Sequence, residues 1–358
     1  MLSFFSKEYP PEQYLRYAGS TGQLFGLRAF EFFGGRSNGV LAADIRTGAG
    51  LRYTVMPGRG MDISEAEYKG IPLCFISSTG IVSPSCFEPA GDEWMRSFTG
   101  GLLTGCGMNQ VGNDCVVNGF HYPLHGRVSN TPAENVCMDE GFSDDVFRIR
   151  VKGTIRQAKP LEENLALTRE VSSVAGINEI VIDDVYENRS CKSSPFMILY
   201  HFNIGFPFLS ERTRFIIPHR SVESHIEGRE EKLKAVMTCE PPAADYPEDV
   251  FLFDMKPDKD GSCGMLAVND GENPELGLLI RFPFDVLPRL TLWKQFQEQD
   301  YVVGIEPCNN EVHGLKHAME SGQLRTIGPR QRIKARISLS VLEGEALFAA
   351  VEAMERKA

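Results

Sequence analysis

Two histidines and one glutamate stand where otherwise apolar, strand-like segments turn polar: His125, His201 and Glu306. In the segment 196–207, one alternating face is apolar throughout, and the other turns polar at His201 and Asn203. A buried imidazole or amide needs a partner, because an unpaired buried polar group is costly. We therefore expect the apolar face to point into a core and the other face to open on a cleft.

An imidazole and a carboxylate held in one cleft can act as paired acid and base on a neutral organic substrate. His125 follows the strand-like residues 120–124, and Glu306 ends the apolar run 301–305 before Pro307. Each residue alone has an ordinary explanation, as a turn histidine, a core histidine or a carboxylate at a wet strand end. Together, at the ends of apolar strands, they predict a shared site.

Metal binding is the first alternative for these residues. His121 and His125 are four apart, but Pro123 prevents a regular helix between them. On a strand the two would be roughly 13 Å apart, too far for one ion. A site of two histidines and a carboxylate on a cupin-like scaffold stays open. The glycine-rich segment 97–119 lacks the lysine of a phosphate loop and the spacing of a dinucleotide site, so we expect no cofactor.

Composition limits the classes of partner and the cellular compartment that we expect for this protein. The net charge of −11 argues against nucleic acid or an anionic membrane as a partner. Nine cysteines without a C-x-x-C pair fit reduced thiols. We find neither a signal-peptide pattern nor an apolar run of membrane-spanning length, and so we expect a cytoplasmic protein.

Hydrophobic alternation predicts an all-β fold. Residues 146–152, 177–186 and 332–341 alternate between apolar and polar side chains, as half-buried antiparallel strands do. A helical stripe over 347–354 predicts one C-terminal helix that docks on the sheet. The polar stretch 220–260 reads as a solvated excursion between strands. We predict one domain over residues 1–358, a large antiparallel β-sandwich with a few short helices.

Three motifs resemble those of the aldose 1-epimerases (galactose mutarotases). They are Leu-His-Gly-Arg-Val-Ser-Asn at 124–130, Tyr-His-Phe-Asn at 200–203 and Gly-Ile-Glu-Pro at 304–307. The chain looks most like a less characterised branch of that superfamily, over nearly its whole length. The resemblance implies the galactose mutarotase-like supersandwich, a role in carbohydrate metabolism and cofactor-free isomerase chemistry.

The same resemblance implies a role for each of the three polar residues. His201 would be the general acid on the sugar ring oxygen, Glu306 the general base on the anomeric hydroxyl, and His125 a residue that binds and orients the sugar. The chemistry needs such a set, because ring opening removes a proton from O1 and delivers one to O5. Positioned proton transfer is then sufficient without a metal.

Other candidate substrate contacts come from positions where this sequence differs from the well-studied family and from the residues around them. Arg127 stands where the well-studied family has glycine, and Asn109 stands near a family arginine, so we expect both to contact substrate. In having an arginine beside this histidine, the sequence also resembles the hexose-6-phosphate epimerases of the same superfamily. This resemblance implies that the substrate could be a phosphorylated sugar. Trp293 could stack on a sugar ring or be a core residue. Asp254 is a further candidate for a sugar hydroxyl.

The sequence thus predicts a mutarotase-like enzyme that acts on a small-molecule sugar or sugar phosphate. A carbohydrate-binding protein without turnover and a metal-dependent sugar isomerase are the alternatives. The sequence leaves open the oligomeric state, a homodimer included, and the identity of the sugar. It also leaves open whether Arg59 and Asp62 pair with each other or face a ligand.

Overall fold

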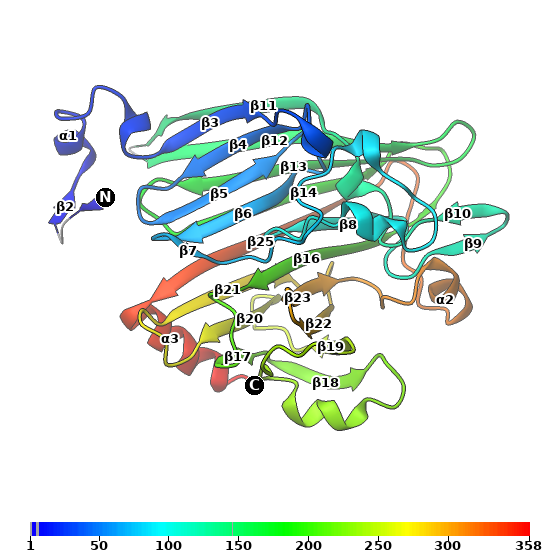
Figure 1. Ribbon diagram of the computed structural model, residues 1–358. Coiled ribbons are helices and arrows are strands. Elements are labelled where there is room, and N and C mark those ends of the chain that lie inside the picture. The colour runs from blue at the N-terminus through cyan, green and yellow to red at the C-terminus, as the bar shows by residue number, and fades with distance from the viewer. Residues whose placement is uncertain (1, 5–6, 145) are drawn as a thin grey trace.

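Three antiparallel sheets form the framework of the computed structural model, which describes residues 2–4, 7–144 and 146–358 (Figure 1). The largest sheet has eight strands, in the spatial order β11-β12-β13-β14-β25-β21-β20-β17. These strands are, in that order, Glu134–Ser143, Val146–Ala158, Asn164–Val174, Glu179–Asn188, Arg332–Glu343, Leu276–Pro283, Ser262–Asn269 and Thr213–Ile216.

The second sheet has six strands, in the order β18-β19-β22-β23-β16-β8. They are His219–Ser224, Asp249–Met255, Arg289–Gln297, Asp300–Cys308, Met197–Gly205 and Thr104–Met108. The third sheet runs in chain order: β3 (Gly26–Glu31), β4 (Leu41–Arg46), β5 (Leu51–Met56), β6 (Asp62–Tyr68) and β7 (Ile71–Pro72). Isolated bridges, such as Cys74 with Ile204, join the second and third sheets.

Short elements complete the described chain. Three two-stranded pairs are β1 (Leu2–Phe4) with β2 (Lys7–Tyr9), β9 (Cys115–Val117) with β10 (Phe120–Tyr122), and β15 (Ser194–Pro195) with β24 (Thr326–Ile327). The α-helices are α1 (Pro11–Tyr14), α2 (Leu315–Glu320) and α3 (Gly344–Glu355). The 3-10 helices are η1 (Thr21–Gln23), η2 (Gly35–Ser37), η3 (Pro84–Cys86), η4 (Glu93–Ser97), η5 (Val128–Asn130) and η6 (Glu230–Ala235).

The main hydrophobic core lies between the eight-stranded sheet and the other two. One buried cluster joins Val151 of β12 and Ile337 of β25 with Val55 of β5, Phe202 of β16 and Ile305 of β23. Alternate residues of β12 and β25 enter this core while their neighbours face outward. The expected antiparallel β-sandwich is therefore confirmed.

The C-terminal helix docks as its apolar stripe predicts. Leu347 and Met354 of α3 are buried against Leu266 and Val268 of β20. Within the described part of the chain, no helix is both long enough and apolar enough to span a bilayer.

The stretch 220–260 is more regular than we expected. It contains most of β18 and all of β19, so the expectation of one solvated excursion is wrong over these strands. The part between them contains the 3-10 helix η6. β18 is the edge strand of its sheet and carries polar residues because much of it faces solvent. β19 is buried and apolar from Val250 to Phe253.

Candidate active site

Two neighbouring strands hold His201 and Glu306 against each other. The ladder between β16 and β23 pairs Phe202 with Ile305, and this register places His201 opposite Glu306. Nε2 of His201 lies 3.1 Å from Oε1 of Glu306, and both side chains are buried. The fold thus converts two residues about a hundred positions apart into a direct acid–base contact.

Both residues lie inside their strands, so our expectation that they stand at strand ends is wrong. β16 continues to Gly205, and β23 passes through Pro307 to Cys308. On the β22 side, Pro307 pairs with Leu290. On the β16 side, the ladder has no pairs at Tyr200 and His201. The strand tolerates a proline at this position because the N–H that proline lacks would fall where the ladder is interrupted. The pair is therefore held by the middle of a sheet.

The two faces of β16 separate core from site. Ile198, Tyr200 and Phe202 point into the main core. Met197 and Leu199, on the same face as His201, pack in a second cluster that borders the cavity described below. This arrangement confirms the division expected from the alternation in the sequence.

Gly304 makes room for the acid–base pair. A Cβ atom at this position would lie 2.6 Å from Oε1 of Glu306, 2.8 Å from Cε1 of His201 and 3.1 Å from Cε3 of Trp293. Gly304 and Glu306 are two apart on β23 and so share a face of the strand. The absence of a side chain at Gly304 is thus what lets the three groups converge.

A cavity of about 340 Å³ opens above the pair. Its lining includes His125, His201 and Glu306 together with the aromatic residues Trp94, Phe98 and Trp293. The ring centroids of Phe98 and Trp293 lie 5.4 Å and 5.6 Å from that of His201. Aromatic faces beside polar groups form a wall on which the apolar face of a small polar molecule can pack.

Burial shifts the pKa values of the pair in opposite directions. It raises the pKa of Glu306 well above the usual range of a carboxylic acid, and the negative charge of Glu248 adds to this effect. It lowers the pKa of His201 well below the usual range of an imidazole, and nearby His125 lowers it further, while a hydrogen bond with Asn203 acts in the opposite sense. A low-dielectric site disfavours any net charge, so the pair is most stable when it holds one proton in total.

His125 faces the same cavity from the loop after β10. Its backbone has a positive φ of 53°, and its ring centroid lies 5.8 Å from that of His201 and 5.1 Å from that of Trp94. Enclosure by protein atoms lowers the pKa of His125 to about 4, so the ring is uncharged at neutral pH. Among the described residues, its buried Nδ1 has no hydrogen-bond partner. The ring can therefore hydrogen-bond a ligand without adding charge to the site.

Two residues that we expected to contact substrate line a different cavity. Arg127 and Asn109 border a second space of about 420 Å³, together with His121. Oδ1 of Asn109 accepts a hydrogen bond of 2.7 Å from Nε2 of Gln157. The loop that carries His125 lines both spaces, and the structure does not bring Arg127 or Asn109 to the acid–base pair.

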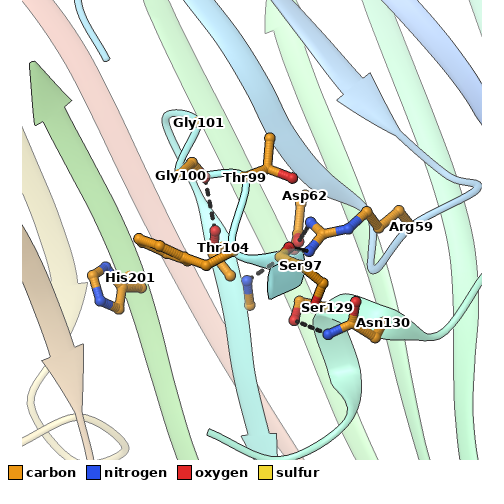
Figure 2. A network of polar contacts seen from close by, with 12 residues as sticks. Arg59, Asp62, Ser97, Thr99, Gly100, Gly101, Thr104, Ser129, Asn130 and His201 are labelled. Carbon is orange, nitrogen blue, oxygen red and sulfur yellow. Dashed lines mark hydrogen bonds and ion pairs between the residues drawn. The ribbon is translucent and has the colours of Figure 1, made fainter. Parts of the chain in front are cut away.

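Arg59 and Asp62 pair with each other. Nη1 of Arg59 lies 3.2 Å from Oδ2 of Asp62, and both side chains are buried (Figure 2). Arg59 also donates to the carbonyl of Ser97, the last residue of η4, which carries Trp94. Asp62 accepts from the backbone N–H of Gly105 on β8 at 2.8 Å. The pair therefore anchors a cavity wall from behind.

Asp254 takes no part in the cavity. Its carboxylate lies 3.6 Å from Nη1 of Arg220, and its side chain is 44% exposed on β19. Sequence reasoning had offered it as a contact for a sugar hydroxyl. Its place on the strand puts it at an exposed ion pair instead.

Acidic groups that the sequence analysis missed line the same cavity. Asp92, Asp114 and Glu248 stand around it with Glu306, and its described lining contains no lysine or arginine. Oε2 of Glu248 accepts a hydrogen bond of 2.9 Å from Nε1 of Trp293, which orients the indole. These acidic residues lie in loops, so no periodic pattern in the sequence marks them. Trp94, the large aromatic residue of the short helix η4, is the signal in this part of the sequence that could have indicated a binding wall.

Comparison with known proteins places the fold. The family described as domain of unknown function DUF4432 matches residues 37–341. A crystal structure from Klebsiella pneumoniae subsp. pneumoniae MGH 78578, provisionally named an aldose 1-epimerase, is 27% identical with a TM-score of 0.87, over 93% of this chain and 89% of the other. A search of curated proteins found no match.

Two more distant structures share the fold alone. A galactose mutarotase-like protein from Clostridium acetobutylicum is 13% identical, with a TM-score of 0.61 over 90% of this chain and 100% of the other. A galactose 1-epimerase from Lactobacillus acidophilus NCFM is also 13% identical, with a TM-score of 0.58 over the same shares. The chain therefore belongs to the DUF4432 family and has the galactose mutarotase-like fold of the aldose 1-epimerase superfamily.

Proposed function

We propose that this protein is a mutarotase-type isomerase that interconverts the anomers of a sugar, with His201 as acid and Glu306 as base. The contact of 3.1 Å between Nε2 and Oε1 carries the proposal. The two sugar oxygens that exchange protons, O1 and O5, are bonded to the same carbon. An acid and a base that serve them must therefore be immediate neighbours, as these two side chains are.

The proton balance of the reaction matches the pair. The form that opens the ring is imidazolium and carboxylate, the less populated of the two single-proton forms of the pair, because burial favours the uncharged form of each group. In this form Glu306 takes the proton of the O1 hydroxyl while His201 gives its proton to O5. The C1–O5 bond breaks as the C1=O1 double bond forms, leaving a neutral imidazole and a carboxylic acid. After rotation about C1–C2, the reverse transfers close the ring on the other face of the aldehyde. Ring opening thus converts one single-proton form of the pair into the other, and no net charge enters the buried site.

The cavity favours an uncharged sugar. Carboxylates of Asp92, Asp114 and Glu248 accept hydrogen bonds from hydroxyls but repel a phosphate. The idea of a phosphorylated substrate depended on Arg127, which lines the other cavity. Trp293 and Phe98 offer aromatic faces to the C–H surface of a pyranose. We therefore propose a free aldose as the substrate.

Exchange spectroscopy by NMR tests this function directly. Magnetisation transfer between the anomers of a panel of free and 6-phosphorylated aldoses is measured with wild type, Glu306→Gln and Glu248→Gln. Both substitutions remove a carboxylate from the same cavity, so Glu248→Gln is the matched control. We expect wild type to accelerate exchange of at least one free aldose, Glu306→Gln to lose about 10²–10⁴-fold in rate, and Glu248→Gln to lose less than tenfold.

Two outcomes would overturn the proposal. Equal loss in the two variants would remove Glu306 from its role as base. Line broadening of a sugar by wild type, without faster exchange for any member of the panel, would favour a carbohydrate-binding protein that lacks turnover.

A further inference from the structure

Beside the catalytic cavity lies a group of metal-binding residue types that the acid–base pair does not use. Glu311, His313 and His317 each offer a ligand atom, and these atoms all lie within 4.8 Å of one another. Tetrahedral zinc ligands at about 2.1 Å from the ion are about 3.4 Å apart, so a closure of little more than 1 Å by side-chain rotation would complete such a site. We propose that these three residues bind a divalent transition-metal ion.

The backbone under the cluster is held in place. Glu311 and His313 lie between β23 and α2, and His317 lies in α2. Gly112 bridges to His313, and a Cβ atom at Gly112 would lie 1.8 Å from the carbonyl oxygen of Val312. The side chain of Gln110 accepts from the N–H of Leu315 at the start of α2. Ligands on a backbone fixed in this way lose little freedom when an ion binds.

An arginine already orients the carboxylate of Glu311. Nη1 of Arg289 donates to Oε1 of Glu311 at 2.7 Å, while Oε2 lies 3.7 Å from Nε2 of His317. Metal-binding carboxylates are commonly held through one oxygen by a partner of this kind, with the other free for the ion. The side chain of His317 is 46% exposed, which gives an ion a path from solvent.

A third imidazole packs on the cluster from the cavity side. The ring centroid of His225 lies 4.0 Å from that of His313, which in turn lies 4.3 Å from that of His317. His225 lines the catalytic cavity, and its buried Nδ1 has no partner among the described residues. The three imidazoles form a row of ring contacts that runs from the half-buried His225 and His313 to the exposed His317. His225 either supports His313 or supplies a fourth ligand atom.

The ligand types indicate the class of metal. Two imidazoles and one carboxylate suit zinc, iron, nickel or copper, whereas calcium and magnesium prefer oxygen ligands. The acidic cavity nearby adds a favourable field for any cation. The ion would link the segment after β23 with α2 at the rim of the cavity. The proposal of a metal site does not rest on the proposed mutarotase activity.

Calorimetric titration with zinc chloride tests the site. Full-length protein is treated with a chelator, dialysed, and titrated as wild type, His317→Ala, Glu311→Gln and His121→Ala. The last variant is the matched control, because His121 also faces a carboxylate, Asp114, at 3.3 Å on the surface. We expect wild type to bind one equivalent of zinc, both ligand variants to bind at least about tenfold more weakly, and His121→Ala to bind as wild type does.

Cobalt(II) absorption gives a second measurement that is independent of catalysis. Wild type with one equivalent of cobalt should show visible bands that change in His317→Ala and stay unchanged in His121→Ala. Zinc should also raise the Tm of wild type and leave that of His317→Ala unchanged. The proposal is overturned if wild type binds no zinc below about 100 μM, or if both ligand variants bind zinc as tightly as wild type.

Discussion

Histidine and glutamate meet at two places in the described part of the chain, and the two places differ in burial. His201 and Glu306 lie on central strands of a sheet, buried, with their register set by the ladder. Glu311, His313 and His317 lie on a loop and a six-residue helix, where the first two are half-buried and His317 is exposed to solvent. Burial suits the first pair to move protons, because it disfavours the charged form of each group. Exposure suits the second cluster to take up a cation from solution.

Removing the acid should have the largest effect and fall on turnover alone. His201→Asn removes the proton donor to O5, and we expect the exchange rate to fall about 10²–10⁴-fold. In the double variant with Glu306→Gln the loss should be little greater than in either single variant, because the two groups act as a unit. Exchange NMR measures the rates, and a thermal melt within a few degrees of wild type excludes unfolding. Multiplicative losses would contradict the shared proton.

The pH profile of kcat/KM should be a bell that includes pH 7. Below the acid limb both groups hold protons, and Glu306 cannot accept from O1; above the alkaline limb neither does, and His201 cannot donate. Because burial lowers the pKa of His201, the acid limb should lie below the ordinary imidazole value of about 6.5, with a fall of about tenfold per pH unit beyond it. An acid limb at or above that value would contradict the uncharged site.

The aromatic wall should affect binding more than chemistry. Trp293→Leu removes an indole that packs beside His201 and is oriented by Glu248. A stacking contribution of about 0.5–1.5 kcal/mol corresponds to a rise in KM of about twofold to tenfold, with little change in kcat. Trp293→Phe should recover part of the loss. A fall in kcat with KM unchanged would instead place the indole in the chemical step.

The smallest effect should come from the cluster of Glu311, His313 and His317. His317→Ala and removal of metal by chelation should each change kcat by less than about twofold, because no proton of the reaction passes through this cluster. Initial rates before and after chelator, with zinc added back, measure the change. A loss as large as that of His201→Asn would merge the two regions into one site and would favour the metal-dependent isomerase.

Much of the fold was predictable because its signal is local. The alternation over 146–152 and 332–341 predicts half-buried strands, and both belong to longer strands of the eight-stranded sheet. The error at 220–260 has a physical cause: β18 is an edge strand with a polar sequence, and it conceals its pairing with the apolar β19. Composition alone does not distinguish such an edge strand from a solvated loop.

The candidate site was predictable only in part. A histidine and a glutamate that interrupt apolar runs are visible in sequence, and the structure brings His201 and Glu306 into contact. Proximity in sequence misled us at Arg127, because a turn sends residues two positions apart into different cavities. The cluster at 311–317 has the spacing Glu-x-His-x-x-x-His in the sequence, but this spacing alone does not show that the loop and α2 bring the three side chains together.

Gly304 sets a low mutational barrier between two kinds of protein. A single methyl group there would enter the space shared by Glu306, His201 and Trp293 and would meet side-chain atoms rather than backbone, so these side chains would have to shift while the strand keeps its place. Glycine and alanine codons differ by one base. One nucleotide change could therefore separate His201 from Glu306 while leaving the sheet and the aromatic wall in place, so that the isomerase proposed above would become a sugar-binding protein without any change of fold.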